Sequence, residues 1–188
     1  MPRPNDAFCH LPQLRERIAP AEASSLRVTP QTLALWDERA RLQGRGADWR
    51  LSDAQLQATQ MALLGDGSDG QDLWIFGYGS LTWDPGFHFS EVRLAVLPAH
   101  RRRFSCRTVL GRGSPECPGL MLTLEPGEGD CHGLAFRIDA THAAHECGMV
   151  WRREMIRAIY RPCLLPVHTP QGEVDALVFA ANTEHADH

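Results

Sequence analysis

From Gln71 onward the sequence is a series of short apolar runs, interrupted every few residues by glycine or proline. Runs of this length and composition are typical of β-strands, and the interruptions are typical of turns. They predict strands at residues 73–77, 92–97, 103–110, 119–124, 132–138 and 174–181. A stretch rich in glycine and proline at 125–130 predicts a hairpin turn, and residues 140–158 show a clear helical pattern. Many strands with one helix favour an α+β fold with a mixed, curled, barrel-like sheet flanked by helices.

Residues 1–70 differ from this part of the chain and predict helices. Thr29-Pro30 is a favourable helix start, and Ser52 is a favourable cap for a second helix that ends in a run of glycine and aspartate. We therefore predict a helical N-terminal extension at 1–70, in which no site is recognisable, and a second domain at 71–188.

The overall charge argues against polyanionic partners. The formal net charge of the 188 residues is −4, which supplies no general attraction to nucleic acid or to an anionic membrane. No apolar run approaches the roughly 18 residues of a membrane helix, and the first residues lack the apolar stretch of an export signal. We expect a cytoplasmic monomer that acts on a small molecule, with no nucleic-acid or membrane partner.

All 19 basic residues are arginine, and the chain contains no lysine. This excludes Schiff-base and pyridoxal phosphate chemistry and the lysine-dependent phosphate sites. The six cysteines lie far apart without a C-x-x-C pair, so the sequence predicts no metal site. We expect reduced thiols, with Cys106, Cys131 and Cys147 packed as small apolar residues.

A glycine-containing turn follows the first predicted strand. It consists of Phe76, Gly77, Tyr78, Gly79, Ser80 and Leu81. Its glycines let the backbone turn sharply and approach a ligand without an intervening Cβ. Consecutive N–H groups in such a turn form an anion-binding nest or an oxyanion hole. A plain tight turn is the alternative, because the segment matches neither the dinucleotide fingerprint nor the G-x-S-x-G elbow of hydrolases.

One carboxylate occupies an unusual place on the helix predicted at 140–158. The residues that form its apolar stripe are Ala143, Cys147, Val150, Trp151 and Ala158. Glu154 falls near the centre of this stripe, because it lies one turn from Val150 and from Ala158. The side chains predicted on the other side of the helix are His145, Glu146, Arg152 and Arg153.

Carboxylates are rarely buried unless they are paired or functional. Glu154 therefore has two interpretations. It is either half of a buried ion pair, with Arg157 or a distant arginine, or a base whose pKa is raised by desolvation.

Two other patterns predict ordinary surface residues. His142 and His145 in the H-x-x-H-E segment lie off the apolar stripe, where solvated side chains are expected rather than metal ligands. Arg101, Arg102 and Arg103 predict a solvated strand start. A serine–histidine–aspartate triad assembled in space stays open at this point.

Five segments in this order resemble the ChaC-type, glutathione-specific gamma-glutamylcyclotransferases. They are WIFGYGSLTWDPGF (74–87), HRRRF (100–104), RGSPECPGLMLTLEP (112–126), HGLAFRI (132–138) and WRREM…Y (151–160). The resemblance covers about residues 71–182. It implies a barrel-like sheet with flanking helices, and cytosolic cleavage of glutathione into 5-oxoproline and cysteinylglycine without metal or cofactor.

The resemblance also implies roles for individual residues. Glu154 matches the catalytic glutamate of the family, the segment Phe76–Leu81 matches its substrate-binding loop, and Tyr160 matches a tyrosine near the glutamate. Residues 1–70 fall outside the matching part. Relatives continue into further helices beyond the position of His188, so we expect the catalytic domain at 71–188 to be shortened at its C-terminal end.

The reaction implied by the resemblance needs little from the protein. The α-amine of the γ-glutamyl group attacks its own side-chain carbonyl, and an intramolecular nucleophile already has a high effective concentration. One carboxylate and a set of N–H donors are sufficient. Two alternatives remain: a non-catalytic γ-glutamyl-binding regulatory protein, and an amide hydrolase that uses Ser80 or a cysteine.

Overall fold

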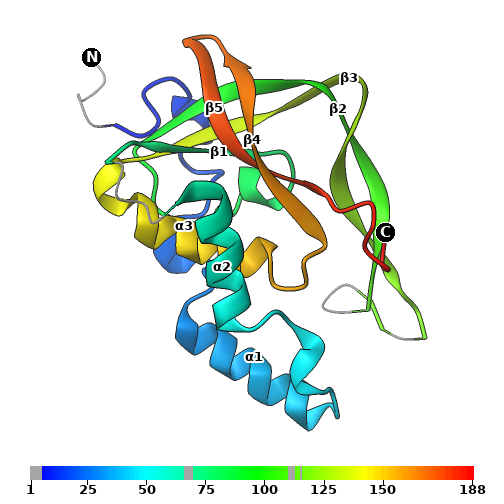
Figure 1. The fold of residues 1–188 in the computed structure, drawn as a ribbon. Coiled ribbons are helices and arrows are strands. Elements are labelled where there is room, and N and C mark those ends of the chain that lie inside the picture. The colour runs from blue at the N-terminus through cyan, green and yellow to red at the C-terminus, as the bar shows by residue number, and fades with distance from the viewer. Residues whose placement is uncertain (1–5, 66–69, 110–112, 115) are drawn as a thin grey trace.

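Five strands in the described part of the chain close into a barrel (Figure 1). The computed structural model describes residues 6–65, 70–109, 113–114 and 116–188. The strands are β1 (Leu73–Gly77), β2 (Glu91–Thr108), β3 (Gly119–Ile138), β4 (Tyr160–Thr169) and β5 (Gly172–Ala181). Their order is β1-β3-β2-β4-β5, and a parallel β1–β5 pair closes a ring of otherwise antiparallel ladders. The predicted α+β fold with a mixed, barrel-like sheet is confirmed.

β2 and β3 form one long antiparallel hairpin where the sequence pattern predicts four shorter strands. The predicted turn at 125–130 is wrong, because β3 runs through it and Glu125, for example, lies opposite Arg101. The pairing shifts register between Pro98 and His100. A bulge of this kind bends a strand without ending it, so residues that usually mark a turn belong here to a bent ladder.

β4 is absent from the sequence-based prediction. It contains Pro162 and Pro166, which cannot donate to a ladder and usually argue against a strand. β4 pairs with β5 along its whole length but with β2 only at Val96 and His168. It is therefore close to an edge strand, where proline is tolerated. The predicted strand end at residue 110 lies outside the described residues, as does most of the predicted linker at 65–70.

The described helices are α1 (Pro30–Leu42), α2 (Asp53–Leu64) and α3 (Ala140–Glu154), with 3₁₀ turns at Pro12–Leu14, Ala21–Ala23, Ala47–Trp49 and Ser80–Thr82. Both predicted helix starts are confirmed: the Thr29 side chain accepts from the backbone of the first turn of α1, and Ser52 forms a capping box with Gln55. The predicted end of α3 at residue 158 is wrong. The helix stops at Glu154, and Ala158 has a φ of 54°, which ends any helical path.

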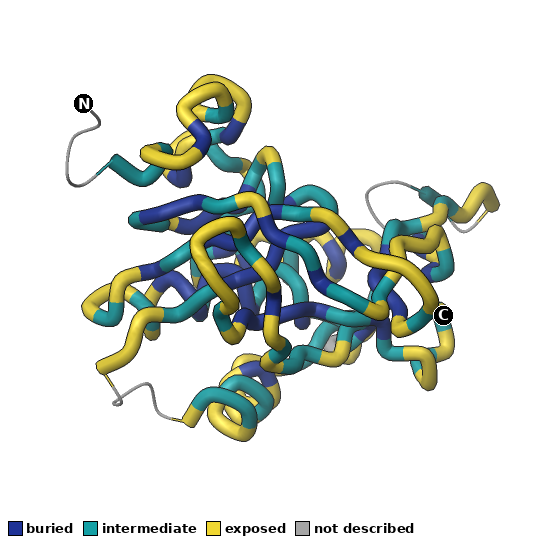
Figure 2. The backbone as a smooth tube through the Cα atoms, turned by 90° about the horizontal axis from the view of Figure 1, so that it is seen from above, coloured by how far each residue is buried: buried dark blue, intermediate teal, exposed yellow. Residues whose placement is uncertain are grey.

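Buried side chains form two clusters, and Figure 2 shows the buried stretches of the chain gathered at the centre of the molecule. Neighbouring residues alternate between them, so Val178 points into the barrel interior and Phe179 points out. The outer cluster includes Leu56 of α2 and Trp151 of α3. This packing fixes α3 against the barrel.

The described part of the predicted extension packs on the barrel and on α3, while α1 lies farthest from the barrel (Figure 1). Ala7 accepts a backbone hydrogen bond from Val92 of β2 at 2.9 Å. Arg27 forms an ion pair of 2.7 Å with Glu146 of α3. The prediction that Glu146 projects away from the core is therefore wrong, because it is 2% exposed. None of the described helices has the length and apolarity of a membrane span.

Candidate active site

The glycine-containing segment begins where β1 ends, at Gly77. Tyr78 turns its side chain into the barrel, where it is 9% exposed and its hydroxyl donates to the carbonyl of Phe179 at 2.8 Å. The carbonyl of Tyr78 accepts from Arg102 Nε at 2.7 Å. Gly77 leaves little room for a side chain, because a Cβ there would lie only 3.1 Å from Leu81 Cβ. The turn is therefore held tightly at its start.

Two carbonyls of this segment accept from the residues that follow it. Gly79 O accepts from Thr82 N at 2.9 Å and from Thr82 Oγ1 at 2.7 Å, and Ser80 O accepts from Asp84 N at 2.9 Å. The backbone N–H groups of Gly79, Ser80 and Leu81 donate to no acceptor among the described residues. Three consecutive unused donors can bind a developing negative charge.

The predicted loop residues differ in what their side chains can reach. Phe76 is 0% exposed inside the barrel, and Leu81 is 5% exposed in the outer cluster. Gly77 and Gly79 have no side chain, so only Tyr78 and Ser80 bring polar side chains to the segment. The loop therefore offers mainly its backbone, and the binding role of its six residues stays a prediction.

Glu154 is the last residue of α3, and its side chain is 13% exposed. Burial raises the pKa of its carboxyl, and the charge of Arg153 opposes this rise. Arg153 Nε lies 3.0 Å from Glu154 Oε1. The ion-pair interpretation named Arg157, which instead binds Asp187 at 2.8 Å. Glu154 is thus largely shielded from solvent and paired, with its sequence neighbour Arg153 as the partner.

Arg153 was predicted to project away from the core, and this is wrong: its side chain is 8% exposed. Its Nη1 donates to the carbonyls of Asp84 at 2.7 Å and Pro85 at 3.1 Å, and its Nη2 donates to Ser80 Oγ at 2.8 Å. One guanidinium therefore joins the loop to Glu154. The sequence signal for it was weak, because an arginine beside a core position normally extends to solvent.

Two tyrosines lie within the electrostatic reach of Glu154. Burial raises the pKa of Tyr78 and of Tyr160, and the carboxylate charge of Glu154 raises both further. Both phenols therefore stay protonated at neutral pH and can act as hydrogen-bond donors. Tyr160 is the first residue of β4, six positions after Glu154. The structure thus brings the predicted residues of α3, of β4 and of the loop together.

Arg102 has a structural role that sequence reasoning missed. The run of three arginines predicted a solvated strand start, and Arg101, Arg102 and Arg103 are all exposed. Arg102 also donates to the carbonyls of Tyr78 and His132, so an exposed arginine of β2 holds the start of the loop.

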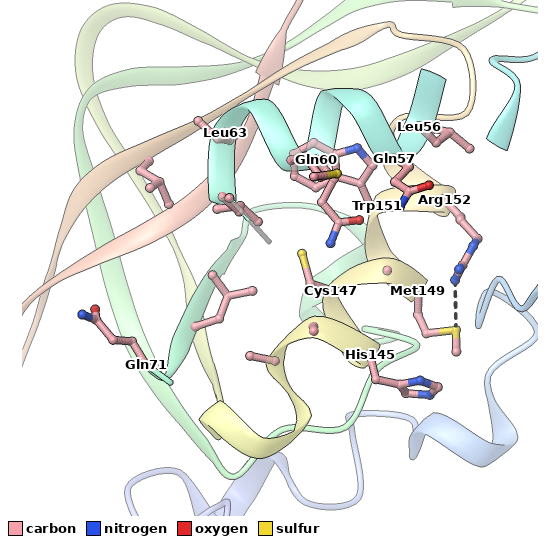
Figure 3. A pocket seen from close by; sticks show the side chains of 18 of the residues that line it. Leu56, Gln57, Gln60, Leu63, Gln71, His145, Cys147, Met149, Trp151 and Arg152 are labelled. Atoms are coloured by element: carbon pink, nitrogen blue, oxygen red, sulfur yellow. Dashed lines mark hydrogen bonds between the residues drawn. The ribbon is translucent and has the colours of Figure 1, made fainter. Parts of the chain in front are cut away.

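A cavity of about 1170 Å³ lies elsewhere, between α2 and α3 (Figure 3). Leu56, Leu63 and Trp151 supply apolar walls, and Cys147 lines it with a thiol whose pKa burial raises to about 12. None of its lining residues belongs to the loop, and Glu154 is not among them. The cavity and the candidate site are therefore separate.

The sequence predicted no metal ligands. His142 and His145 are exposed, as expected, and no group of three or more His, Cys, Asp or Glu in the described residues could hold a metal ion. Cys106, Cys131 and Cys147 are at most 2% exposed, which confirms that they pack as core residues. A reaction without metal or cofactor stays a prediction.

Comparison with known proteins identifies relatives of this arrangement. A family model described as "ChaC-like protein" matches residues 73–188. The glutathione-specific gamma-glutamylcyclotransferase of Escherichia coli (strain K12) is 36% identical over 138 residues, which are 73% of this chain and 59% of the relative. The glutathione-specific gamma-glutamylcyclotransferase 1 of Mus musculus is 34% identical over 125 residues, which are 64% of this chain and 56% of the relative. The chain thus spans just over half the length of these curated relatives.

A solved structure supports the fold. The yeast gamma-glutamyl cyclotransferase specific to glutathione superposes with a TM-score of 0.56 at 19% sequence identity, over 62% of this chain and 72% of the yeast chain. At this identity the likeness concerns the fold alone. The family match, in contrast, covers more than half of the sequence and includes both the loop and Glu154. This protein therefore belongs to the ChaC-like protein family.

Proposed function

We propose that this protein is a gamma-glutamylcyclotransferase that cleaves glutathione into 5-oxoproline and cysteinylglycine. The observation that carries the proposal is a largely buried carboxylate, Glu154, joined through Arg153 to a loop in which three consecutive backbone N–H groups donate to no acceptor among the described residues. The family match and the names of the curated relatives support the same activity.

In the proposed reaction the α-amine nitrogen of the γ-glutamyl group bonds to its own side-chain carbonyl carbon. The amide bond between this carbon and the cysteine nitrogen breaks, and two protons move from the attacking nitrogen to the leaving nitrogen. Glu154 relays these protons, because burial raises the pKa of its carboxyl and so makes it a stronger base than an exposed glutamate. The N–H groups of Gly79–Leu81 stabilise the oxyanion that forms at the carbonyl.

The decisive experiment incubates the purified protein with glutathione and measures 5-oxoproline. The wild-type chain should form it, and Glu154→Gln should lower kcat by at least about a hundredfold, the usual scale for loss of a general base. Glu184→Gln is the matched control, because Glu184 is 80% exposed and pairs with Arg161 away from the loop. A folded Glu154→Gln variant with a near-normal rate would remove Glu154 from the mechanism.

The products also decide between the alternatives. A serine or cysteine hydrolase would release glutamate through a covalent acyl-enzyme, and a binding protein would hold glutathione without turnover. The surroundings of Ser80 disfavour the hydrolase, because its Oγ accepts from Arg153, a cation that cannot take a proton from a nucleophile. Trapping of a covalent adduct on Ser80 would nevertheless establish it.

The chemistry of the substrate indicates the compartment in which this protein acts. Glutathione is a thiol, and the six cysteines of this chain are all free, which suits a reducing compartment. We therefore propose a cytoplasmic protein that acts as a monomer on a small molecule. Light scattering of the purified chain tests the monomer, and a mass of twice 21.0 kDa would contradict it.

A further inference from the structure

We propose that Arg153 is a positioning residue, which holds the carboxylate of Glu154 at a fixed place relative to the loop Gly77–Leu81. This inference rests on the proposed function. The guanidinium is almost fully buried, and it makes four polar contacts of 3.1 Å or less. Three of its acceptors, on Ser80, Asp84 and Pro85, belong to the loop and its continuation, and the fourth is Glu154 itself.

The contact with Glu154 is an ion pair without a hydrogen bond. Arg153 Nε lies 3.0 Å from Oε1, and the Glu154 carboxylate accepts no hydrogen bond from the described residues. The positive charge favours the ionised carboxylate and so opposes the effect of burial, while the lone pairs of the carboxylate remain available for a proton. Arg153 therefore favours the form of Glu154 that accepts a proton, without competing for the acceptor.

The contact with Ser80 orients a second group. Arg153 Nη2 donates to Ser80 Oγ at 2.8 Å. Because one lone pair of this oxygen is used, the hydroxyl hydrogen turns away from the cation and can donate to a substrate carboxylate or carbonyl. The same arginine thus prepares an acceptor on Glu154 and a donor on Ser80.

The planar guanidinium is essential for this arrangement. Its five N–H donors diverge from one rigid group, so it can hold two carbonyls, a hydroxyl and a carboxylate at once. An ammonium at the end of a flexible chain would supply the charge but not the fixed fork. Charge and geometry can therefore be separated by substitution of this one residue.

The test compares Arg153→Gln, which removes both properties, with Arg153→Lys, which retains the charge. We expect Arg153→Gln to lower kcat with glutathione by at least about tenfold. On the acidic side of the pH profile (its acid limb), the midpoint of the fall in kcat/KM should shift to a higher pH by about one unit, the usual effect of one neighbouring charge. Arg153→Lys should also lower kcat but leave the acid limb near its wild-type position.

Arg152→Gln is the matched control. Arg152 neighbours Arg153 on the same helix, but it lies at the cavity between α2 and α3, where its Nη1 is 3.8 Å from Met149 Sδ (Figure 3). It forms no ion pair with a described residue. This variant should keep the wild-type kcat and pH profile. Equal losses in the Arg152 and Arg153 variants, or an unmoved acid limb in Arg153→Gln, would overturn the proposal.

A measurement without turnover separates this inference from the proposed function. Carboxyl-carbon NMR titration of Glu154 should give a higher pKa in Arg153→Gln than in the wild type and in Arg152→Gln. If the wild type forms no 5-oxoproline, the proposed function fails, while the titration still tests the control of Glu154 by Arg153. If Arg153→Gln does not fold, Arg153→Lys provides the test. A wild-type kcat in Arg153→Lys would overturn the role of the planar guanidinium.

Discussion

Glu154 differs from the other carboxylates of the chain through its surroundings. Buried Glu146 has its pKa pushed up by burial, but hydrogen bonds from Arg27 and the backbone of His88 lower the pKa below the ordinary value. Glu154 lacks such donors among the described residues, so burial prevails and its pKa is raised. Two glutamates on one helix are therefore suited to different roles, one structural and one chemical.

This difference predicts a pH-dependent stability. A carboxyl whose pKa is raised in the folded protein stabilises it fully below the ordinary value of 4.5, and the contribution disappears as the pH rises through the folded-state pKa. Wild type should therefore lose stability relative to Glu154→Gln as the pH rises above 4.5. Urea unfolding of both proteins across this range measures it. A difference that stays constant with pH would contradict the raised pKa.

Gly79 supplies a second prediction at this scale. A Cβ on Gly79 would lie 3.8 Å from Leu122 Cδ2, which is an ordinary contact. The fold thus accommodates a side chain at a place where a substrate approaches the loop backbone. Gly79→Val should abolish glutathione binding, or raise KM at least about tenfold, which corresponds to about 1.4 kcal/mol. The urea midpoint serves as the control and should hardly change. Normal KM in this variant would show that substrate binds elsewhere.

At the scale of elements, the turn between α3 and β4 joins Glu154 to Tyr160 and therefore sets their relative positions. Ala158 in this turn has a φ of 54°, a conformation that costs a non-glycine residue about 1–2 kcal/mol. Asn182, just after β5, holds the turn: its side chain donates to Ala158 O at 3.1 Å, and its N–H donates to Ile159 O at 2.9 Å. Contacts from a neighbouring strand therefore stabilise a strained residue next to the candidate site.

Relief of this strain should be measurable. Ala158→Gly should stabilise the protein by about 0.5–1 kcal/mol, because glycine adopts a positive φ without a steric penalty, although the unfolded chain gains some entropy. Ala144→Gly is the matched control: it lies exposed inside α3, where glycine costs about 1 kcal/mol. Urea midpoints at an unchanged m-value measure both. Destabilisation in both variants would show that the turn is not strained.

At the scale of the whole molecule, the N-terminal segment forms part of the support of α3. Thr59 of α2 accepts from Trp151 Nε1 at 3.0 Å, and Leu51 N donates to Ile156 O at 2.9 Å, two residues beyond Glu154. Arg27 adds two hydrogen bonds to Glu146, at 2.7 and 2.9 Å. Residues outside the family match thus contact the helix that carries Glu154 at its end.

Removal of Arg27 tests the strength of this support. Arg27→Met should destabilise the protein by about 3 kcal/mol, because it leaves the nearly buried charge of Glu146 without its partner. The double variant Arg27→Met/Glu146→Met should lose less than the single one, since no buried charge remains. Chemical unfolding of the three proteins provides the comparison. An Arg27→Met variant as stable as the wild type would mean that the N-terminal segment contributes no support here.

Local patterns in the sequence were enough for several features. The caps at Thr29 and Ser52, the strand at 73–77 and the inward position of Glu154 follow from interactions between residues a few positions apart. The same reasoning placed a turn with two glycines at the end of this strand, and left open whether it binds a ligand. These features are encoded locally, because helical and strand periodicity depend on neighbours in the chain.

The tertiary structure decided what depends on distant partners. β3 runs through residues 125–130 because β2 pairs with both ends of this segment, and β4 forms despite its two prolines because β5 lies alongside. Glu146 is buried because Arg27, 119 residues away, neutralises it, and Arg153 is buried because loop carbonyls accept its donors. A charged side chain enters the interior only where the fold supplies a partner, and no local pattern contains that partner.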